Sequence, residues 1–317
     1  MEFVWLFVGF ALLIKGADVM IEAASKLARS FGIPTMVIGL TVIALGTSMP
    51  EAAIGIMSAV NKTNQLTLGD VIGSSVANVA LIIGFSAVLR PLTIQPGTIS
   101  RDIPLSIMVQ AVFAVFLLTG QGIDRLESIT LMIALVGYLF YMVRSSKPEN
   151  NESQDTFNKS DSGEKPVSAM RWRSFLITLA GMAGVMGGSK LIVDNAILIA
   201  EGFGLSETMI GITVVALGTS LPELVVSIVS VTRKEHGLLV GNIIGSNIFN
   251  ILFVVGVSGT IYPIASSDTI WINLALMLTV SVLFLLMAKR SKRISRPEGS
   301  FLLVFYVAFL ALAVLTT

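Results

Sequence analysis

The sequence predicts an all-α polytopic membrane protein, with ten transmembrane helices arranged as two inverted-topology repeats of five. Three observations predict this class. Of the 317 residues, 54% are hydrophobic and only 13% are charged, fewer charges than a soluble domain needs to cover its surface. Apolar stretches long enough to cross a bilayer recur along the whole chain. One motif occurs twice, once in each half.

The composition also excludes several kinds of site. The net charge of +1 gives no indication of nucleic-acid binding, and the absence of cysteine excludes disulfides, thiolate metal sites and cysteine nucleophiles. A single histidine, His236, cannot form a histidine metal cluster. The chain has neither an HExxH motif nor a paired intramembrane aspartate in either half. We therefore expect a protein that is not an enzyme and has no organic cofactor.

The predicted spans divide the chain into two halves. A polar stretch, residues 145–172, is rich in Ser, Asn, Glu and Lys, cannot bury a core and is expected to be a flexible linker. It separates a first five-helix repeat, 1–144, from a second, 173–317. The ten spans are predicted near residues 3–28, 35–60, 66–89, 103–120, 126–143, 174–200, 207–232, 238–262, 270–288 and 299–316.

The distribution of basic residues predicts the orientation. Of the 21 Lys and Arg residues, only Lys62 and Arg125 fall in loops of one face, and Lys15 and Lys190 fall within spans. The others lie on the face that holds the linker, and cytoplasmic loops carry the excess of Lys and Arg. We therefore expect a cell-membrane protein with both termini outside and the linker in the cytoplasm.

The repeated motif recurs at an offset of 172 residues. Residues 38–51 read IGLTVIALGTSMPE and residues 210–223 read IGITVVALGTSLPE, with 11 identities in 14 positions. Because five spans separate equivalent positions, the second copy has to cross the membrane in the opposite direction. Inverted repeats of this kind occur in transporters that bind their substrate near the midplane.

Each copy of the motif carries one isolated acid. Glu51 is the only charged residue between 35 and 60, and Glu223 the only one between 208 and 232. A carboxylate at mid-membrane costs at least ~2.5 kcal/mol, so a functional role is the default. The alternative is a structural, hydrogen-bonded carboxyl that burial keeps neutral; the symmetric recurrence and the polar neighbours argue against it.

The neighbours of these acids supply further oxygen atoms. Pro50 and Pro222 interrupt the helices, and we expect carbonyls near Ala44 and Ala216 to lose their regular partners. Hydroxyls lie three and four residues before each acid, on the same helical face: Thr47, Ser48, Thr219 and Ser220. Carboxylate, hydroxyl and carbonyl oxygens are the ligands that hard cations such as Ca²⁺ and Na⁺ prefer.

The spans that follow each motif add neutral oxygens. Residues 73–78 read GSSVAN and residues 245–250 read GSNIFN. Their spacing places Ser74 with Asn78, and Ser246 with Asn250, on one helical face. Small-residue packing is the alternative role for the serines, and cross-linking of helices is the alternative for the asparagines. Two carboxylates would balance one Ca²⁺ or a comparable charge of Na⁺.

At these residues the sequence resembles the sodium/calcium exchanger family of cation/Ca²⁺ antiporters, in its prokaryotic form. The resemblance covers essentially the whole chain and implies exchange of Na⁺ for Ca²⁺ by alternating access. It implies that Glu51 and Glu223, with Thr47 and Thr219, hold Ca²⁺, and that the first and sixth spans slide as a gating pair. It also implies flanking Na⁺ sites formed by Ser48, Ser74, Ser220, Ser246 and the carbonyls of Ala44 and Ala216.

Two positions depart from the family pattern. Potassium-dependent members carry Asp where this chain has Asn250, so we expect no K⁺ co-transport. Asp70 stands where the family often has Asn, and where the second repeat has Asn242; we place it near the outer end of its span, with a solvated or entrance role. Proton-driven Ca²⁺ exchange remains an alternative because carboxylates also bind protons, and an uncoupled cation channel is a second one. We expect the chain to act as a monomer.

Overall fold

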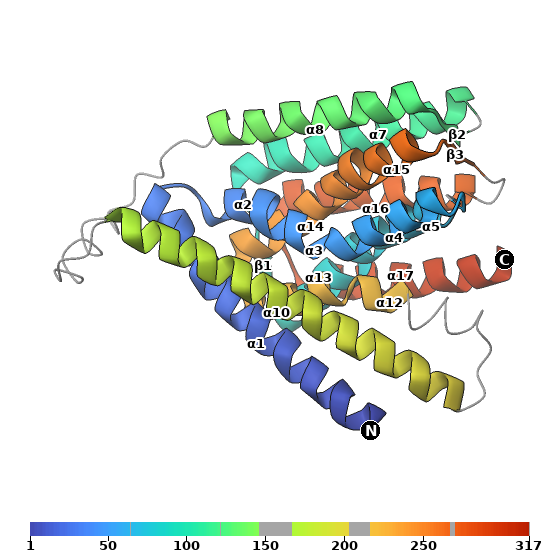
Figure 1. The fold of residues 1–317 in the computed structure, drawn as a ribbon. Coiled ribbons are helices and arrows are strands. Elements are labelled where there is room, and N and C mark those ends of the chain that lie inside the picture. Colours follow the sequence, from blue (N-terminus) through green and yellow to red (C-terminus); the bar gives the residue numbers. More distant parts are fainter. Residues whose placement is uncertain (64, 121, 146–166, 203–215, 267–269, 317) are drawn as a thin grey trace.

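The computed structural model describes residues 1–63, 65–120, 122–145, 167–202, 216–266 and 270–316. These residues form a bundle made almost entirely of helices (Figure 1). By length and composition, seven of the described helices could cross a membrane, or eight if the bent pair Thr35–Thr47 and Met49–Val60 is one span. Every predicted span overlaps a helix, although residues 207–215 of the seventh lie outside the described residues.

The helices have the following bounds. In the part before residue 146 they are α1 Glu2–Phe31, α2 Thr35–Ile38, η1 Gly39–Ile43, α3 Ala44–Thr47, α4 Met49–Val60, α5 Gln65–Val76, η2 Ala77–Ile83, α6 Gly84–Leu89, η3 Thr98–Asp102, α7 Ile103–Gly120 and α8 Arg125–Ser145. In the part after residue 166 they are α10 Val167–Gly202, α12 Ala216–Thr219, α13 Leu221–Thr232, α14 His236–Phe249, η5 Asn250–Val255, α15 Gly256–Ile261, α16 Ile270–Ser291 and α17 Arg296–Thr316. The η segments are π-helical turns, which the sequence did not predict.

Two boundaries of the predicted linker need comment. Most of the predicted segment lies outside the described residues, but its last part, 167–172, is helical because α10 begins at Val167. Ala, Met and Arg are good helix formers, and this first part of α10 is also anchored. Arg171 donates to the Ser30 carbonyl at 2.7 Å, and the Trp172 ring stacks on Phe175 with centroids 5.7 Å apart. The linker prediction was therefore wrong at its C-terminal boundary.

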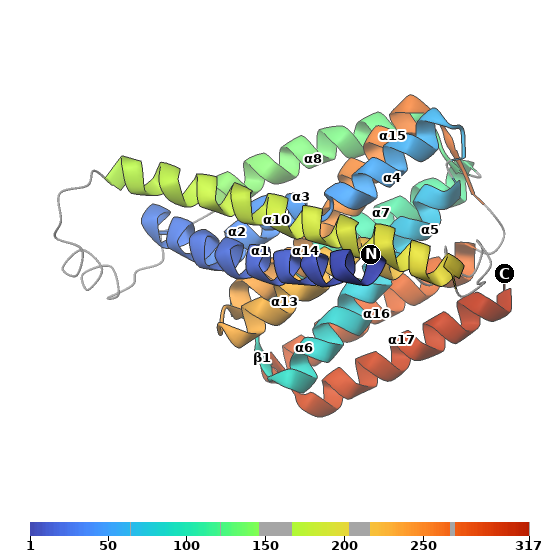
Figure 2. The ribbon, with the colours of Figure 1, turned by 60° about the horizontal axis from the view of Figure 1, so that its bottom comes forward.

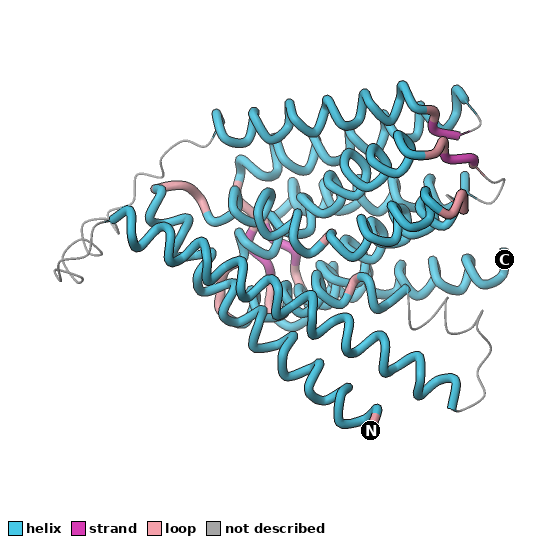
Figure 3. Tube along the Cα trace, viewed as in Figure 1, coloured by secondary structure: helices cyan, strands magenta, loops and turns pink. Residues whose placement is uncertain are grey.

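Short strands join the helices in two places (Figure 3). Strand β1, Leu92–Thr93, pairs antiparallel with β4, Arg293–Ile294. Strand β2, Gly122–Ile123, pairs antiparallel with β3, Ile264–Ala265. Each pair links a loop of one half to a loop of the other, so the halves are tied together at two positions. The all-helical prediction missed these two pairs because two-residue strands leave no periodic pattern.

The centre of the bundle is formed by α14 and α15. In the most apolar window of His236–Ile261, 94% of the residues are buried, against 28% in the window of α8. The outer helices instead expose large apolar side chains, such as Leu118, Phe140 and Val304. Lipid tails can cover such surfaces without cost, whereas water cannot. A residue on α14 is therefore shielded from both lipid and water.

Helices α1 and α10 lie side by side and run in opposite directions (Figures 1 and 2). Glycines allow the two backbones to meet at two points. A Cβ added to Gly9 would lie 3.0 Å from the Gly188 carbonyl oxygen, and one added to Gly181 would lie 2.8 Å from that of Gly16. The two contacts exchange when 172 is added to the first member, since 9 becomes 181 and 16 becomes 188. Small residues at a helix crossing allow this close approach in membranes.

The crossing of α1 and α10 gives a stability prediction. A Cβ on residue 188 would stand 2.5 Å from the Leu13 backbone nitrogen, whereas one on the neighbouring Gly187 would meet only a Leu12 methyl at 3.6 Å. We expect Gly188→Ala to destabilise the protein by ~1–3 kcal/mol through overpacking, and Gly187→Ala to be neutral or slightly stabilising. Thermal unfolding of both variants in detergent checks this; equal midpoints would contradict it.

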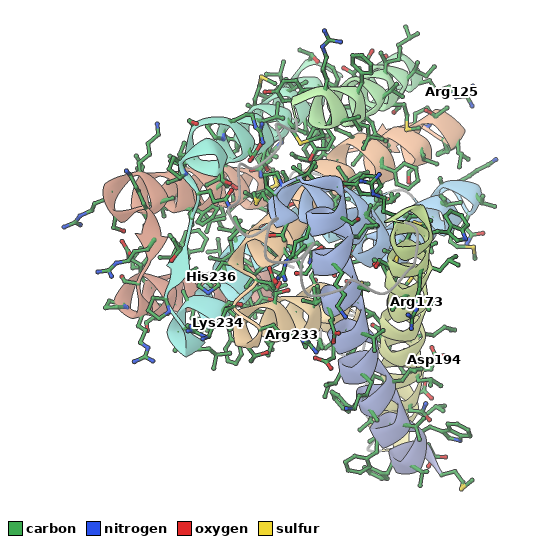
Figure 4. All side chains as sticks on the ribbon, turned by 90° about the vertical axis from the view of Figure 1, so that its left-hand side faces the viewer. Arg125, Arg173, Asp194, Arg233, Lys234 and His236 are labelled. Carbon is green, nitrogen blue, oxygen red and sulfur yellow. The ribbon has the colours of Figure 1, made fainter. Side chains whose placement is uncertain are left out.

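Basic residues gather at the end of the bundle where α8 ends and α10 begins, called here the linker end. Figure 4 looks onto this end and labels Arg233, Lys234 and His236, where α13 runs into α14. Arg29 contacts Glu235 at 3.0 Å, and β4 brings Arg293 to Thr93. At the opposite end, Lys62 lies 5.9 Å above the Tyr262 ring. The charge asymmetry predicted from the loops is thus preserved in three dimensions.

Candidate ion-binding site

Two helix breaks position the two glutamates. Ser48, with φ −82° and ψ 4°, interrupts the chain between α3 and α4, and Ser220, with φ −86° and ψ 0°, does the same before α13. Each break is followed by proline in the first turn, so Glu51 and Glu223 both lie in the first turn of a new helix. The free N–H groups and the dipole of a helix N-terminus stabilise negative charge there.

Both glutamates are buried in the interior. Glu51 and Glu223 are each 1% exposed. Among the described residues, the Oε2 atoms of both side chains have no hydrogen-bond partner. A buried polar atom without a partner costs about 1–3 kcal/mol, and more when charged. Two such oxygens in one interior therefore indicate a place for a ligand that accepts their lone pairs.

A cluster of oxygen atoms surrounds Thr47, which joins the two halves. Its hydroxyl donates to the Asn242 Oδ1 atom at 3.0 Å and lies 3.3 Å from the Ser246 hydroxyl. Ser246 in turn donates to Glu223 Oε1 at 3.4 Å. The hydroxyl of Thr47 has one proton and therefore satisfies only one of its oxygen neighbours at a time. The cluster is rich in acceptors and poor in donors, which suits a cation.

The asparagines lie in the same buried region but in two different situations. Asn78 donates from Nδ2 to Asn247 Oδ1 at 2.9 Å, and its own Oδ1 has no partner among the described residues. Asn250 is 0% exposed, and neither of its amide atoms has a partner there. Both asparagines lie in the π-helical segments η2 and η5, and π-bulges are frequent at functional sites. The alternative role of cross-linking helices applies to Asn78.

Sequence reasoning did not assign a role to Asn242 or Asn247. Both contact predicted site residues, Asn242 through Thr47 and Asn247 through Asn78. Asn247 lies inside the GSNIFN motif, and its equivalent in the first repeat is Ser75. Two polar residues at equivalent positions of the repeat were the signal that could have identified this position. The remaining predicted serines, Ser48, Ser74 and Ser220, are all buried as a site requires.

The expectation of a freed carbonyl at Ala44 is wrong. The Ser48 N–H donates to the Ala44 oxygen at 3.0 Å, and the Thr47 hydroxyl lies 3.4 Å from the same atom. Proline at position 50 removes the donor of the carbonyl four residues earlier, at Gly46, and leaves the Ala44 bond intact. The carbonyl of Ala44 can serve an ion only if it shares its lone pairs. For Ala216, the structure describes no side-chain contact.

The placement of Asp70 also needs correction. We expected a solvated residue near the end of its span. Asp70 lies on α5, accepts a hydrogen bond from the Thr219 hydroxyl and is only partly exposed. Its Oδ2 atom is buried without a partner among the described residues. The side chain therefore contacts a predicted ion ligand, because the first turn of α5 already lies beside α12.

The site is closed toward the linker end by two helices that touch backbone to backbone. A Cβ on Gly241 of α14 would lie 2.5 Å from the Met36 oxygen, and one on Gly245 would lie 2.6 Å from the Ala44 methyl. The equivalent positions in the first repeat differ: around Gly69 and Gly73, no atom of the described chain comes within 4 Å. The two sides of the site are therefore packed unequally.

The chemistry of the donor set fits a hard cation. In the described part of the chain, no three acidic, histidine or cysteine side chains converge into a metal centre of their own. An ion at Glu51 and Glu223 would therefore depend on neutral hydroxyl and amide oxygens as well. Ca²⁺ takes six to eight oxygens of mixed type, and Na⁺ prefers the same hard ligands. The bundle and this centre define a polytopic membrane protein with a buried, oxygen-lined acidic site.

Comparison with known proteins identifies the family. A model described as sodium/calcium exchanger protein matches residues 1–144 and 173–315. The inner membrane protein YrbG of Escherichia coli is 34% identical over 318 residues, which cover 97% of this chain and 95% of its own. The sodium/calcium exchanger MaX1 of Methanosarcina acetivorans is 32% identical over 342 residues, covering 98% and 97%. The chain belongs to the sodium/calcium exchanger family.

Solved structures of the sodium-calcium exchanger NCX_Mj have the same fold. One that was soaked with 2.5 mM Na⁺ and 0.1 mM Ca²⁺ matches with a TM-score of 0.85 and 29% identity, covering 98% of this chain and 97% of that chain. Another, soaked with 10 mM Na⁺ and no Ca²⁺, matches with the same TM-score of 0.85. The chain is thus a multi-pass integral membrane protein of this family, and the resemblance noted in the sequence is confirmed.

Proposed function

We propose that this protein is a secondary antiporter that exchanges Na⁺ for Ca²⁺ across the cell membrane by alternating access, with the ions bound at Glu51 and Glu223. The observation that carries the proposal is the pair of buried glutamates with partnerless oxygens, linked through Ser246 and Thr47. An intramembrane carboxylate of this kind marks an ion pathway by default. Membership of the exchanger family gives the direction of the inference.

The proposed architecture is that of ten spans in two inverted halves, 1–144 and 173–317, joined by a cytoplasmic linker. Contacts that exchange under a shift of 172 residues support it, since an inverted pair maps onto itself in this way. The glycine contacts of α1 with α10 behave so. Basic residues at the linker end support a cytoplasmic location for this end and an external one for both termini.

The proposed ligands follow from where the oxygens lie. Ca²⁺ would be bound by both glutamates with Thr47 and Thr219. The flanking Na⁺ positions would use the buried oxygens nearby, with Asn78 and Asn250 supplying amide oxygens between the halves. These flanking ligands are Ser48, Ser74, Ser220 and Ser246, together with the Ala44 and Ala216 carbonyls. No cofactor enters the proposal, because the ions are the substrates.

Flux in proteoliposomes tests the function. Liposomes loaded with Na⁺ and diluted into Na⁺-free medium should accumulate ⁴⁵Ca²⁺, and the accumulation should collapse when the Na⁺ gradient is removed. Replacing K⁺ by choline on both sides should leave the rate unchanged, because Asn250 stands where potassium-dependent members carry Asp. Single-protein liposomes should be as active as crowded ones if the monomer is the functional unit.

Other results would overturn the proposal. Uptake that ignores Na⁺ but follows a pH gradient would identify proton-driven Ca²⁺ exchange. Ca²⁺ flux without any coupling to a second ion, at rates far above those of a carrier, would identify a channel. Both outcomes are separable in the same preparation, since each gradient can be imposed alone.

A further inference from the structure

The inverted repeat is broken at one polar position beside the ion site. Asp70 and Asn242 are 172 residues apart and occupy equivalent positions on α5 and α14. Each accepts a hydrogen bond from the threonine of the opposite half: Thr47 donates to Asn242 at 3.0 Å, and Thr219 donates to Asp70. The two contacts are equivalent in geometry and differ in charge, because one acceptor is an amide and the other a carboxylate.

The surroundings of the two acceptors differ as well. Asn242 is 0% exposed and lies where α14 packs on η1 and α2, between Gly241 and Gly245. Asp70 is partly exposed and lies between Gly69 and Gly73, around which the described chain leaves space. Its buried Oδ2 has no partner there. The carboxylate therefore combines an unused oxygen with room for an ion.

We propose that Asp70 and the Thr219 hydroxyl form a Na⁺-binding position that the other half of the site lacks. The proposal rests on the Na⁺/Ca²⁺ antiport proposed above and assigns a specificity-determining residue to it. A single carboxylate balances one monovalent cation, so Na⁺ leaves no net charge at this position. Ca²⁺ is attracted more strongly to the two glutamates, and Asp70 does not converge with them into one three-carboxylate centre.

The consequence is that the two halves of the site differ in Na⁺ affinity. A unit charge about 4 Å from a cation contributes from ~1 kcal/mol in water to ~4 kcal/mol near a protein surface. Removing the charge while keeping the shape therefore weakens Na⁺ binding about tenfold. The effect on Ca²⁺ is smaller, because its main ligands remain.

Two isosteric substitutions test the assignment. Asp70→Asn gives this half the amide of its equivalent, and Asn242→Asp gives the other half a carboxylate. We expect Asp70→Asn to raise the Na⁺ concentration that half-saturates Na⁺-driven ⁴⁵Ca²⁺ uptake about tenfold. The Na⁺ concentration that half-stabilises the purified protein against heat, in the absence of Ca²⁺, should rise equally. The corresponding Ca²⁺ concentration should shift by less than about threefold, and Asn242→Asp should lower the Na⁺ value.

The outcomes are separable from failure of the proposed function, because the wild-type flux experiment tests that function first. Na⁺ half-saturation within about twofold of wild type in Asp70→Asn would overturn the assignment. So would equal weakening of Na⁺ and Ca²⁺, which would identify Asp70 as a general attractor of cations. If Asp70→Asn does not fold, Asp70→Ser keeps an oxygen without the charge, and unchanged Na⁺ binding in that variant would overturn the assignment equally.

Discussion

Replacing Glu51 or Glu223 by glutamine is expected to abolish Na⁺-driven ⁴⁵Ca²⁺ uptake and, with it, the stabilisation of the protein by Ca²⁺. Each substitution keeps the size of the side chain and removes one charge from a site that is 1% exposed. Two unit charges 4 Å apart interact by about 4 kcal/mol at an effective dielectric constant of 20. Half of that would weaken binding of even a monovalent cation roughly thirtyfold, and Ca²⁺ carries twice the charge.

Ca²⁺-dependent thermal unfolding separates loss of binding from loss of folding. Without Ca²⁺, both glutamine variants should unfold at or above the wild-type temperature, because a buried charge with a partnerless oxygen has been neutralised. With Ca²⁺, wild type alone should gain stability, since a ligand stabilises only the state that binds it. Glu201→Gln, at the exposed end of α10, is the control. A glutamine variant that Ca²⁺ stabilises as it does wild type would contradict the assignment.

Sequence alone located the helices and the glutamates because both depend on local signals. A carboxylate in an apolar span is visible without coordinates, and the 172-residue repeat identified its counterpart. The Thr47 contacts were not predictable in the same way. They cross 195 residues to Asn242 and 199 residues to Ser246, and the partner choice depends on which face α14 turns toward α3.

The wrong expectations have local physical causes. The Ala44 carbonyl keeps its bond because the donor that proline removes belongs to a different carbonyl, one turn along. Asp70 was placed by its distance along a span, which ignores that α5 enters the bundle beside α12. The π-helical segments shift the phase of Asn78 and Asn250, and no sequence period marks such a shift. Asymmetry between equivalent positions, such as Asp70 and Asn242, is therefore more informative than either residue alone.

The closed linker end gives the second large prediction. A cavity of about 430 Å³ lies at this end, and Met36 and Val240 are among its lining residues, with Arg90, Lys234 and His236. Beyond it, Gly241 touches the Met36 carbonyl and separates the cavity from the Thr47 cluster. We expect Gly241→Ala to force α2 and α14 apart. The overpacking, ~1–3 kcal/mol, would shift the equilibrium toward an opened linker end roughly tenfold for each 1.4 kcal/mol.

Thiol labelling measures this opening directly, because the chain contains no cysteine. Leu40 lies on η1 behind the glycine contact and is 0% exposed. A Leu40→Cys protein should react slowly with N-ethylmaleimide, and the same protein carrying Gly241→Ala should react about tenfold faster. Gly69→Ala, the equivalent change where the described chain leaves space, should not accelerate labelling at this position.

Transport should fall in Gly241→Ala even though every proposed ion ligand is unchanged. An exchanger needs each side of the site to close in turn, and a ligand can shift such an equilibrium only by its differential affinity for the two states. A permanent bias of 1–3 kcal/mol toward an opened linker end would have to be overcome in every cycle. Equal labelling of Leu40→Cys with glycine or alanine at position 241 would show that something other than this backbone contact keeps the linker end shut.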